Sequence, residues 1–408
     1  RGDVTAVRTA VRVFVEPSGR RIEPFDDPPG EVLIGNRRLA DWLDAAIREA
    51  GLTRVETLTP PCLVVPDTLF TTGGALRMFV DGAAGRDAVL VLKQTRVARN
   101  TVPIQPGVTE IETGWRFEAI RFVSGRDEAP VDVVVDPDEK LLDLPVANPY
   151  LGTEKLELSF PRHPLMTVHH WVHILWANQL YGSIELRSTP PWRMGLRLAW
   201  AALRALSLNK WKVLGKLNRI GKGCDIHPTA VVEGATLGDG VRIGPFARVL
   251  LSTLGDGAEV MPGAMVELST VGERAVISEK CMIRFSVLYP EAVVSQYLMQ
   301  QCVLGRRAVT TGGSFSIDLN FDHPIRVPLD GKLHSTGTKF LGSAFGHRCR
   351  VGTGFWMASG RMVPNDYFLV RHPDLVLSKL PPGLAELNPQ AVDGRTLTPL
   401  GLPKPSGD

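Results

Sequence analysis

The sequence predicts an α/β sheet in the first half of the chain and a three-sided parallel β-helix in the second half. The β-helix is predicted by apolar residues that recur on three interleaved tracks. The tracks consist of Ile226, Ile243, Val260 and Ile277; of Val232, Val249, Val266 and Ile283; and of Leu237, Leu254, Val271 and Leu288. Each step along a track is 17 residues, and glycine follows the apolar residue at Gly238, Gly255 and Gly272.

Neither of the common periodicities produces these tracks, because a helix repeats every 3.6 residues and a strand alternates every two. A coil with three short flat faces places one aliphatic residue inside per face and so gives the observed spacings. This is the hexapeptide type of parallel β-helix, which we expect over residues 222–375 in its left-handed form. We expect the regular step to fail after Leu288, at Tyr289 and Pro290, and to return imperfectly at residues 303–305.

The composition indicates an ordinary globular protein with room for two or three domains. With 46 basic and 43 acidic residues, the net charge of +3 is too balanced to indicate a nucleic-acid partner. The five cysteines are scattered and form no cysteine–histidine cluster, so we expect no metal site and a reducing, cytoplasmic location. No apolar stretch reaches the roughly 18 residues that a membrane span requires.

The first half of the chain, residues 1–185, alternates strand and helix patterns, which predicts a sheet with parallel strands. Residues 11–15, 61–67 and 88–94 are expected to form buried strands. The helix between the first two presents Leu39, Trp42, Leu43, Ala46 and Ile47 on one face. Ligands of such sheets bind at the carboxyl ends of the strands, so the turn after Val15 and the residue Asp67 are the candidate positions.

This head resembles the sugar-1-phosphate nucleotidyltransferases, which have a Rossmann-like fold. Residues 19–25 (GRRIEPF) are similar to part of that family's first loop. Residues 61–70 (PCLVVPDTLF) are similar to the strand whose aspartate helps to hold Mg²⁺. Residues 173–180 (HILWANQL) resemble a segment near the end of the family's domain. The resemblance places Gly19, Arg21 and Asp67 at the nucleotide site.

Three departures from that family indicate that the nucleotide site is degenerate. A loop that cradles phosphates needs backbone N–H groups close to the anion, but Pro17 removes a donor and Glu16 adds a negative charge. Gly30 takes the place of the family's lysine, and the segment between Glu56 and Pro60 is too short to hold the family's base-recognition motif. We therefore expect an inactive head that binds no Mg²⁺; a nucleotidyltransferase with a remodelled loop is the alternative.

The second half resembles the C-terminal half of the bifunctional N-acetylglucosamine-1-phosphate uridyltransferase/glucosamine-1-phosphate acetyltransferase family. Residues 312–323 (GGSFSIDLNFDH) and 345–364 (FGHRCRVGTGFWMASGRMVP) carry this resemblance. Members of that family are trimers in which acetyl-CoA lies between the coils of adjacent subunits. The resemblance implies a homotrimer, acetyl-CoA or another acyl-CoA as the donor, and a small-molecule acceptor.

The base that removes the acceptor's proton in that family is a histidine, and its position falls near Gln300, which cannot carry a proton. We expect His323 to replace it, because imidazole titrates near neutral pH and Asp322 is available to orient the ring. The alternative is that His323 is an ordinary loop histidine beside a proline turn. The resemblance places Asn320, Lys339 and Thr353 beside the acyl donor.

The remaining histidines carry weaker signals. His334 and His347 are lesser candidates for the base, and His347 fits an outward position on the coil. His169, His170 and His173 resemble a metal cluster only superficially, because adjacent helical residues point apart and no cysteine or carboxylate follows closely. We expect these three to pack between the head and the segment that follows it.

Residues 186–221 are predicted to form a helical connector. Arg193, Arg197 and Arg204 share one stripe of it, and Trp192 and Trp200 lie among leucines. Such a basic, tryptophan-bearing helix can lie on an anionic membrane, which makes residues 192–219 a candidate membrane surface. The favoured alternative is a helix that caps the open end of the β-helix.

The sequence therefore predicts CoA-dependent acyl transfer to an amine or hydroxyl group, with an inactive nucleotidyltransferase-like head. Its rival is a catalytically inactive trimeric scaffold or regulatory pseudoenzyme, since motifs are altered in both halves. Residues 376–408 are rich in proline and glycine and are expected to form an extended tail.

Overall fold

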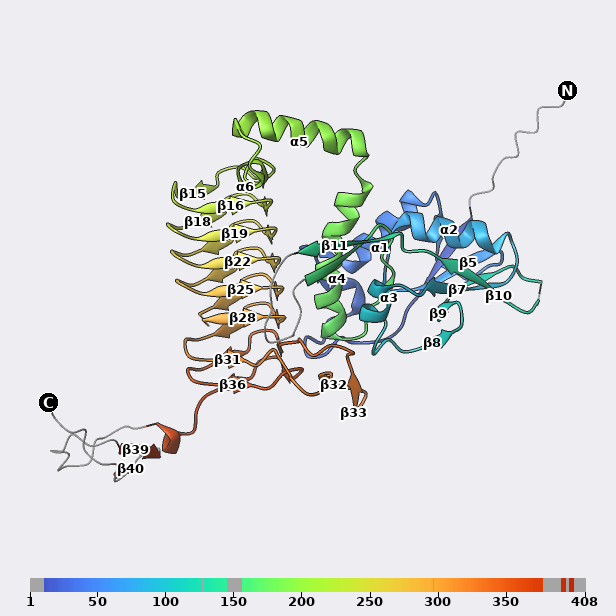
Figure 1. Ribbon diagram of the computed structural model, residues 1–408. Helices are drawn as coiled ribbons and strands as arrows, with labels where there is room; N and C mark the ends of the chain where they lie inside the picture. Colours follow the sequence, from blue (N-terminus) through green and yellow to red (C-terminus); the bar gives the residue numbers. More distant parts are fainter. Residues whose placement is uncertain are drawn as a thin grey trace.

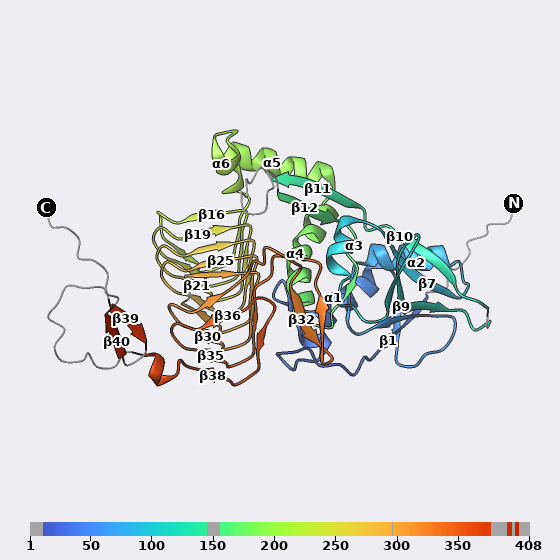
Figure 2. The same ribbon diagram turned by 60° about the horizontal axis from the view of Figure 1, so that its bottom comes forward.

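The computed structural model describes residues 11–126, 128–144, 156–295, 297–376, 390–393 and 396–399. The head lies beside the coil, and helix α4 (Trp171–Ser188) runs between them (Figure 1). Helices α5 (Pro191–Ala205) and α6 (Lys210–Leu214) lie at the end where the coil begins. Figure 2 shows the stacked strands of the coil with the head to one side of them.

The head is built on a seven-stranded mixed sheet. Its strand order is β10 (Val131–Val135), β7 (Ala88–Lys93), β9 (Gly114–Val123), β5 (Cys62–Pro66), β1 (Arg12–Glu16) and β4 (Thr53–Val55), and β8 (Val108–Ile111) pairs with β9. Helices α1 (Leu39–Glu49), α2 (Gly73–Ala83) and α3 (Arg96–Thr101) pack against it in one apolar cluster. The predicted apolar face of α1 is confirmed, because Leu39, Leu43, Ala46 and Ile47 are buried.

The expectation of an all-parallel sheet is wrong at one strand. Strand β1 is parallel to β4 and β5, and β10 is parallel to β7, but β9 is antiparallel to both β5 and β7. The reason is local, because β8 and β9 form a hairpin around Glu112 and Thr113, which reverses the direction of the chain. The nucleotidyltransferase-like topology of the head stays a prediction.

Helix α4 joins the head to the coil through side-chain contacts. The Asn178 side chain donates to the carbonyl of Leu33 (2.9 Å) and accepts from the amide of Gly35 (2.8 Å). A Cβ atom on Gly35 would lie 2.7 Å from the ring of Tyr181, so this close approach requires glycine. The Tyr181 hydroxyl in turn donates to Thr253 on the coil (2.5 Å).

Three parallel sheets form the faces of the coil. The first contains β14 (Arg219–Ile220), β17 (Thr236–Leu237), β20 (Thr253–Leu254), β23 (Thr270–Val271), β26 (Val287–Leu288), β29 (Val303–Leu304), β34 (Ala344–Phe345) and β37 (Met362–Val363). The second contains β15 (Asp225–Ile226), β18 (Arg242–Ile243), β21 (Glu259–Val260), β24 (Val276–Ile277), β27 (Val293–Val294), β30 (Val309–Thr310), β35 (Arg350–Val351) and β38 (Phe368–Leu369). The third contains β16 (Val231–Glu233), β19 (Arg248–Leu250), β22 (Met265–Glu267), β25 (Met282–Arg284) and β28 (Leu298–Gln300), and the parallel pair β31 (Phe315–Ser316) and β36 (Trp356–Met357) follows.

The three predicted tracks line the interior of this coil. Each track residue pairs with the next one in its track, for example Ile243 with Val260. Their side chains form a continuous core, which is fully buried from the second coil onward. The parallel pairing at every step fits the left-handed parallel β-helix that the sequence predicts.

The expected failure of the coil after Leu288 is wrong. Strands β27, β28 and β29 follow in register, and only one residue is lost, so that the step from Ile283 to Met299 is 16 residues. The sequence misleads here because Tyr289 and Pro290 occupy a corner of the coil. The Tyr289 side chain packs against the head and not inside the coil. The true interruption comes later, between β31 and β34.

A cluster around Tyr289 fixes the head against the coil. The Tyr289 hydroxyl accepts a hydrogen bond from the amide of Leu33 (3.0 Å), and its ring stacks on Phe25. Asp27 from the head forms an ion pair with Arg306 (2.9 Å) and a hydrogen bond with His347 (3.2 Å). The expected outward position of His347 is wrong, because its ring is buried in this junction against Phe25.

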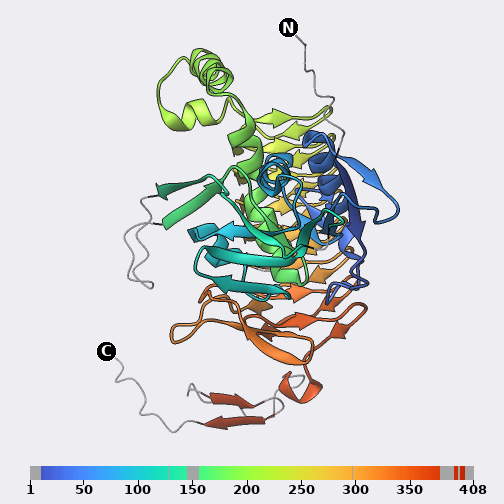
Figure 3. The ribbon, with the colours of Figure 1, turned by 90° about the vertical axis from the view of Figure 1, so that its right-hand side faces the viewer.

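The connector forms helices α5 and α6 and ends in strand β14, and only part of it covers the first coil. Leu214 at the end of α6 covers the first coil and accepts from the amide of Gly234 (3.2 Å), and Asn218 donates to the carbonyl of Val232 (2.8 Å). Helix α5 buries only Ala201 and lies to one side of the stacked strands of the coil (green, upper left in Figure 3). The favoured interpretation of the whole connector as a cap is therefore wrong for α5.

The remaining elements are short. In the head they are η1 (Pro29–Glu31), the antiparallel pair β2 (Leu33–Ile34) and β3 (Arg37–Arg38), the pair β6 (Leu69–Phe70) and β13 (Met166–Thr167), and the pair β11 (Glu139–Leu144) and β12 (Leu156–Pro161). After the coil come η2 (Pro373–Leu375) and the antiparallel pair β39 (Gln390–Asp393) and β40 (Thr396–Pro399). The rest of the expected extended tail lies outside the described residues.

The filled interior of the coil predicts a contrast between two neighbours on β24. Ile277 is buried in the core and Val276 faces outward. Ile277→Ala is expected to lower the free energy of unfolding by about 2–5 kcal/mol, and Val276→Ala by less than about 1 kcal/mol. Urea denaturation measures both values. Equal losses would contradict the assignment of the inner track.

The head–coil junction predicts that Asp27→Ala destabilises the protein by about 2 kcal/mol or more, because Arg306 loses its partner in a partly buried site. The control is Glu259→Ala, which removes the partner of Arg242 in an exposed ion pair and is expected to cost less than about 1 kcal/mol. Chemical denaturation of both variants gives the comparison. A cost for Asp27→Ala no larger than the control would show that the junction does not depend on this pair.

Candidate functional site

The chain leaves the coil once among the described residues, between β31 and β34, and this excursion contains most of the predicted site. It carries the antiparallel hairpin β32 (Arg326–Leu329) and β33 (Lys332–Ser335). Its base is closed by the hydroxyl of Ser316, which donates to Ser343 (2.9 Å), and by an isolated bridge between Leu319 and Phe340. The loop is thus anchored to the coil at both ends.

The excursion brings together three of the predicted site residues. The amide of Asn320 donates to the carbonyl of Lys339 (2.9 Å), and the Asn320 side-chain nitrogen lies 3.1 Å from Nδ1 of His323. The ammonium of Lys339 donates to the carbonyl of Phe321 (2.9 Å). Asp322 contributes only its backbone amide, which donates to Oδ1 of Asn320 (3.2 Å). Among the described contacts, His323 lies beside the Asn320 side chain and the Pro324 carbonyl, and the predicted contact with the Asp322 carboxylate is not made.

The contacts of His323 define what its ring can do. Nδ1 lies 3.1 Å from the carbonyl oxygen of Pro324, which can only accept a hydrogen bond. A proton on Nδ1 donates to this oxygen and leaves the lone pair on Nε2; the Asn320 side-chain nitrogen is also a donor, so in this tautomer it lies beside Nδ1 without a hydrogen bond to it. The side chain is exposed, so a substrate can reach it. A neutral imidazole in this tautomer can accept a proton from an acceptor group at Nε2.

Thr353 lies on the coil surface and not in the loop. Its hydroxyl is 3.3 Å from that of Thr311, one coil away. The next residue, Gly354, lies under Arg371, because a Cβ atom there would be 3.4 Å from the Arg371 side chain. Two hydroxyl groups and a guanidinium group therefore lie close together on consecutive coils.

Two groups near this site were missed by sequence reasoning. Arg371 gave no signal, because its contact with Gly354 depends on the register of the last coils. Asp318 lies in the loop two residues before Asn320, and burial raises the pKa of its carboxyl group. An aspartate inside the apolar run FSIDLNF was the available signal for it.

In the head, the three residues assigned to the nucleotide site do not converge. The Arg21 guanidinium donates to the carbonyl of Asp26 (2.9 Å) and so closes its own turn. The Asp67 carboxylate accepts from the amide of Ser18 (3.1 Å). Gly19 has a positive φ of 64°, and a Cβ atom added to it would have no other atom within 4 Å. The structure thus joins Asp67 to the first loop but leaves Arg21 apart.

A pocket of about 200 Å³ lies at the carboxyl ends of β1 and β5, where the sequence indicated a ligand position. It is lined by Glu16, Pro17, Ser18, Pro66, Thr68, Pro106, Gly107, Phe117, Ala119, Thr167 and His169. Gly19, Arg21 and Asp67 are not among them. Glu16 is paired with Arg121 (3.1 Å). The lining contains no lysine or arginine, so nothing in it would neutralise a triphosphate.

The histidines near this pocket are held neutral. Burial lowers the pKa of His169 and His170 to about 3 and that of His173 to about 4. Nε2 of His170 donates to the carbonyl of Pro328 (3.1 Å), and Nε2 of His173 donates to that of Pro103 (3.1 Å). They pack the start of α4 against the head and the β32–β33 hairpin, so the expected contact with the connector is wrong. No metal-binding group of three was found among the described residues.

The comparisons with known proteins add little to these observations. No family model matches the sequence, and no curated protein matches it. Among solved structures, a candidate acetyltransferase of Bacillus cereus is 11% identical over 37% of this chain and 76% of that chain, with a TM-score of 0.15. A hexapeptide transferase family protein of Anaplasma phagocytophilum is 14% identical over 35% of this chain and 76% of that chain, with a TM-score of 0.13. Both TM-scores are low, so the fold assignment rests on the strand pairing. No helix among the described residues is long and apolar enough to cross a membrane.

The buried histidines predict a loss of stability in mild acid. Their folded pKa values lie below the ordinary histidine value of about 6.5, so the unfolded chain binds protons that the folded chain does not. Their contribution is present above pH 6.5 and is lost as the pH falls toward 4. The free energy of unfolding should drop by up to about 1.4 kcal/mol per pH unit for each histidine.

Urea denaturation between pH 7 and pH 5 measures this slope. His173→Gln keeps a neutral hydrogen-bond donor near Pro103 and should lower the slope of stability against pH by the contribution of about one bound proton. His372→Gln, in an exposed position, should leave this slope unchanged. A stability that stays constant from pH 7 to pH 5 would refute the assignment of neutral buried histidines.

Proposed function

We propose that the protein transfers an acyl group from acyl-CoA to an amine or hydroxyl group of a small, sugar-like acceptor, at the loop between β31 and β34. The observation that carries this proposal is the cluster of Asn320, His323 and Lys339 on a loop anchored to a hexapeptide coil. His323 is the catalytic base, and the Pro324 carbonyl oxygen, which accepts from Nδ1, positions its ring. The retained loop motif supports this assignment, although the family's histidine position holds Gln300.

The proposed step balances in protons and electrons. The acceptor's nitrogen or oxygen attacks the thioester carbonyl carbon while its proton passes to Nε2 of His323. The carbon–sulfur bond then breaks, and the thiolate leaves with the electron pair. The imidazolium returns its proton to the departing sulfur. No redox partner or metal is needed for this chemistry.

The coil surface offers groups suited to the donor. Arg371 and the hydroxyls of Thr311 and Thr353 can bind phosphate oxygens, since guanidinium groups pair with phosphates and hydroxyls donate to them. Lys339 adds a second cation on the loop side. These groups fit an anionic donor such as a CoA thioester, whose phosphates would lie on the coil while its thioester approaches the loop.

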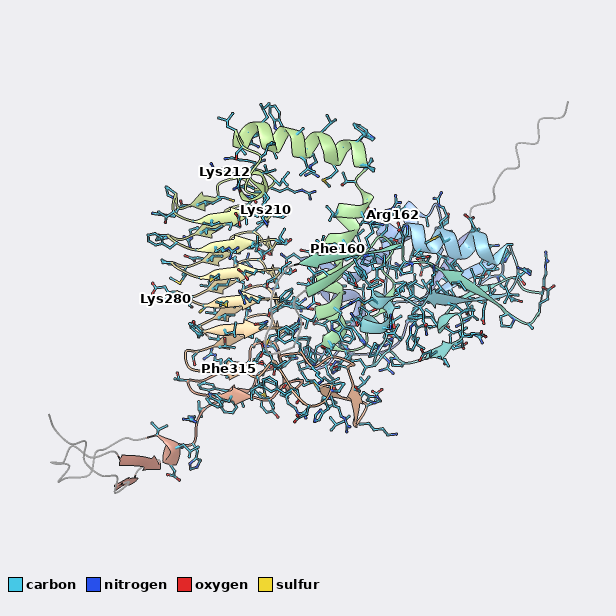
Figure 4. The ribbon with its side chains drawn as sticks, in the orientation of Figure 1. Phe160, Arg162, Lys210, Lys212, Lys280 and Phe315 are labelled. Atoms are coloured by element: carbon cyan, nitrogen blue, oxygen red, sulfur yellow. The ribbon has the colours of Figure 1, made fainter. Side chains whose placement is uncertain are left out.

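The coil also carries exposed aromatic side chains that suit an assembly of several copies. Phe315 on β31 pairs in register with Trp356 on β36, and the Trp356 side chain is 72% exposed (Figure 4 labels Phe315). Exposed apolar patches on a regular surface are typical of interfaces between subunits. We propose that the β-helix assembles as a homotrimer, as the resemblance implies.

The head is proposed to be inactive in nucleotidyl transfer and retained as a binding or scaffolding domain. Three features of its pocket support this: Pro17 lines it, Glu16 brings a negative charge that is tied to Arg121, and Arg21 points elsewhere. The buried hydroxyl of Thr68 and Nδ1 of His169 have no partner among the described residues. Both are neutral groups, so the pocket suits an uncharged ligand better than a triphosphate.

The acyltransferase proposal predicts that His323→Gln lowers kcat for acyl transfer by about 100-fold or more, because removal of a general base costs about that factor. His334→Gln, on the same loop, and His372→Gln, outside it, should keep kcat within about twofold. The assay follows release of free CoA thiol with acyl-CoAs of several lengths and a panel of amino sugars. Calorimetry with the acyl-CoAs gives donor binding separately.

Two outcomes contradict this proposal. If no acyl-CoA binds, the trimeric scaffold or pseudoenzyme is the better interpretation. If acyl transfer occurs and only His334→Gln abolishes it, the base has been assigned to the wrong residue of the loop.

The head proposal predicts no Mg²⁺-dependent release of pyrophosphate from any nucleoside triphosphate with a sugar phosphate. A phosphate-release assay coupled to pyrophosphatase measures this. Release that disappears in Asp67→Asn would show that the head is an active nucleotidyltransferase with a remodelled loop, and would overturn the assignment of the head.

A further inference from the structure

Helix α5 presents an apolar face to solvent and not to the protein. Trp192, Leu196, Trp200 and Leu203 recur at helical spacing on one face, and their side chains are 62%, 63%, 62% and 62% exposed. The opposite face carries Ala201, which is the buried residue of the helix. An ordinary surface helix turns its apolar stripe inward, so this orientation is reversed.

The apolar surface continues past the end of α5. Leu206 terminates the helix in a left-handed conformation and is 89% exposed, and Leu208 is 92% exposed. Together with the four apolar residues of the helix, they form a strip that we call the α5 strip. Its members are Trp192, Leu196, Trp200, Leu203, Leu206 and Leu208.

A stripe of arginines borders this strip. Arg193, Arg197 and Arg204 follow the tryptophans and leucines by one residue and are exposed. The guanidinium of Arg193 lies 5.1 Å from the ring centroid of Trp192. Residues 189–222 contain no aspartate or glutamate, and α6 adds Lys212, which Figure 4 labels beside Lys210. The segment therefore combines exposed apolar side chains with positively charged side chains and contains no negatively charged ones.

Exposed apolar side chains bordered by positive charges favour one kind of binding partner. A second copy of α5 would bring two arginine stripes together, which like-charge repulsion disfavours. An apolar strip bordered by cations matches the boundary between headgroups and acyl chains of an anionic bilayer, with tryptophans at the interface and arginine side chains reaching the phosphates. Helix α5 lies at one end of the molecule, where a flat surface can approach it (Figure 1).

We propose that α5 binds the surface of an anionic lipid bilayer, lying in its interface with the α5 strip toward the acyl chains. The helix lies on the membrane and does not cross it, which agrees with the finding that no described helix can span a bilayer. This surface binding is separate from the acyl transfer proposed for the loop, and either one can fail without the other.

Sedimentation of the full-length protein with vesicles tests the proposal. Vesicles of 30% phosphatidylserine in phosphatidylcholine are expected to bind the protein at least about tenfold more tightly than pure phosphatidylcholine. Raising the salt from about 0.1 M to about 0.5 M should release it, because the electrostatic part is screened. Trp192→Ser/Trp200→Ser and Arg193→Gln/Arg197→Gln/Arg204→Gln should each weaken binding by at least about tenfold.

Matched controls change the same kinds of residue elsewhere. Phe246→Ser removes an aromatic side chain that is 75% exposed on the coil, and Arg86→Gln/Arg99→Gln/Lys280→Gln removes three positive charges outside the connector. Both should bind vesicles as the wild type does. Circular dichroism and the oligomeric state, measured for every variant, show whether the fold is kept.

Three results would overturn the proposal. The first is absence of binding to the anionic vesicles. The second is binding that the controls lower as much as the α5 variants do. The third is that the wild type binds no vesicles while Trp192→Ser/Trp200→Ser changes the oligomeric state. That result would show that a second copy of the chain covers the α5 strip.

Discussion

The rest of the structure depends on the column of aliphatic side chains inside the coil. Each face places one such residue inward at a regular step from Ile226 to Val294; a single residue is lost before Met299, and the excursion then separates Thr310 from its partner Val351. Because the column is continuous, the excursion between β31 and β34 starts and ends on a rigid frame. That frame carries the exposed loop on which the Pro324 carbonyl fixes the orientation of His323.

The head depends on the same column through the junction around Tyr289. Phe25, Asp27, Arg306 and His347 come from distant parts of the chain and meet there in a stacked and ion-paired cluster. Helix α4 adds a second contact where Tyr181 reaches Thr253. The head is thereby fixed beside the coil, and the β32–β33 hairpin touches it through His170. A trimer built along the coil would place every α5 helix at the same end, which would let one bilayer bind several copies together.

Sequence reasoning succeeded where the physical signal is local. The tracks were predictable because every inward residue is determined by its own step along the chain, and the apolar face of α1 because periodicity defines it. It failed where partners are distant in sequence. The sequence predicts a break at Tyr289 and an outward His347, because nothing local indicates that their partners are Leu33 and Asp27 in the head. Likewise, the helical pattern of α5 was evident, but which face lies inward is decided by the fold as a whole.

The assignment of Asn320, His323 and Lys339 to one site stays a prediction, and the structure adds that these residues lie together on one loop. The contacts were not predictable from the sequence, because the Pro324 carbonyl beside Nδ1 and Arg371 beside Gly354 depend on the fold. The most direct measurement of the central claim is an experimental structure of the protein with a nonhydrolysable thioether analogue of acyl-CoA. We expect the thioether beside Nε2 of His323 and the phosphates beside Arg371 and Thr353. Binding of the analogue in the head pocket between Glu16 and His169, with the loop left empty, would contradict it.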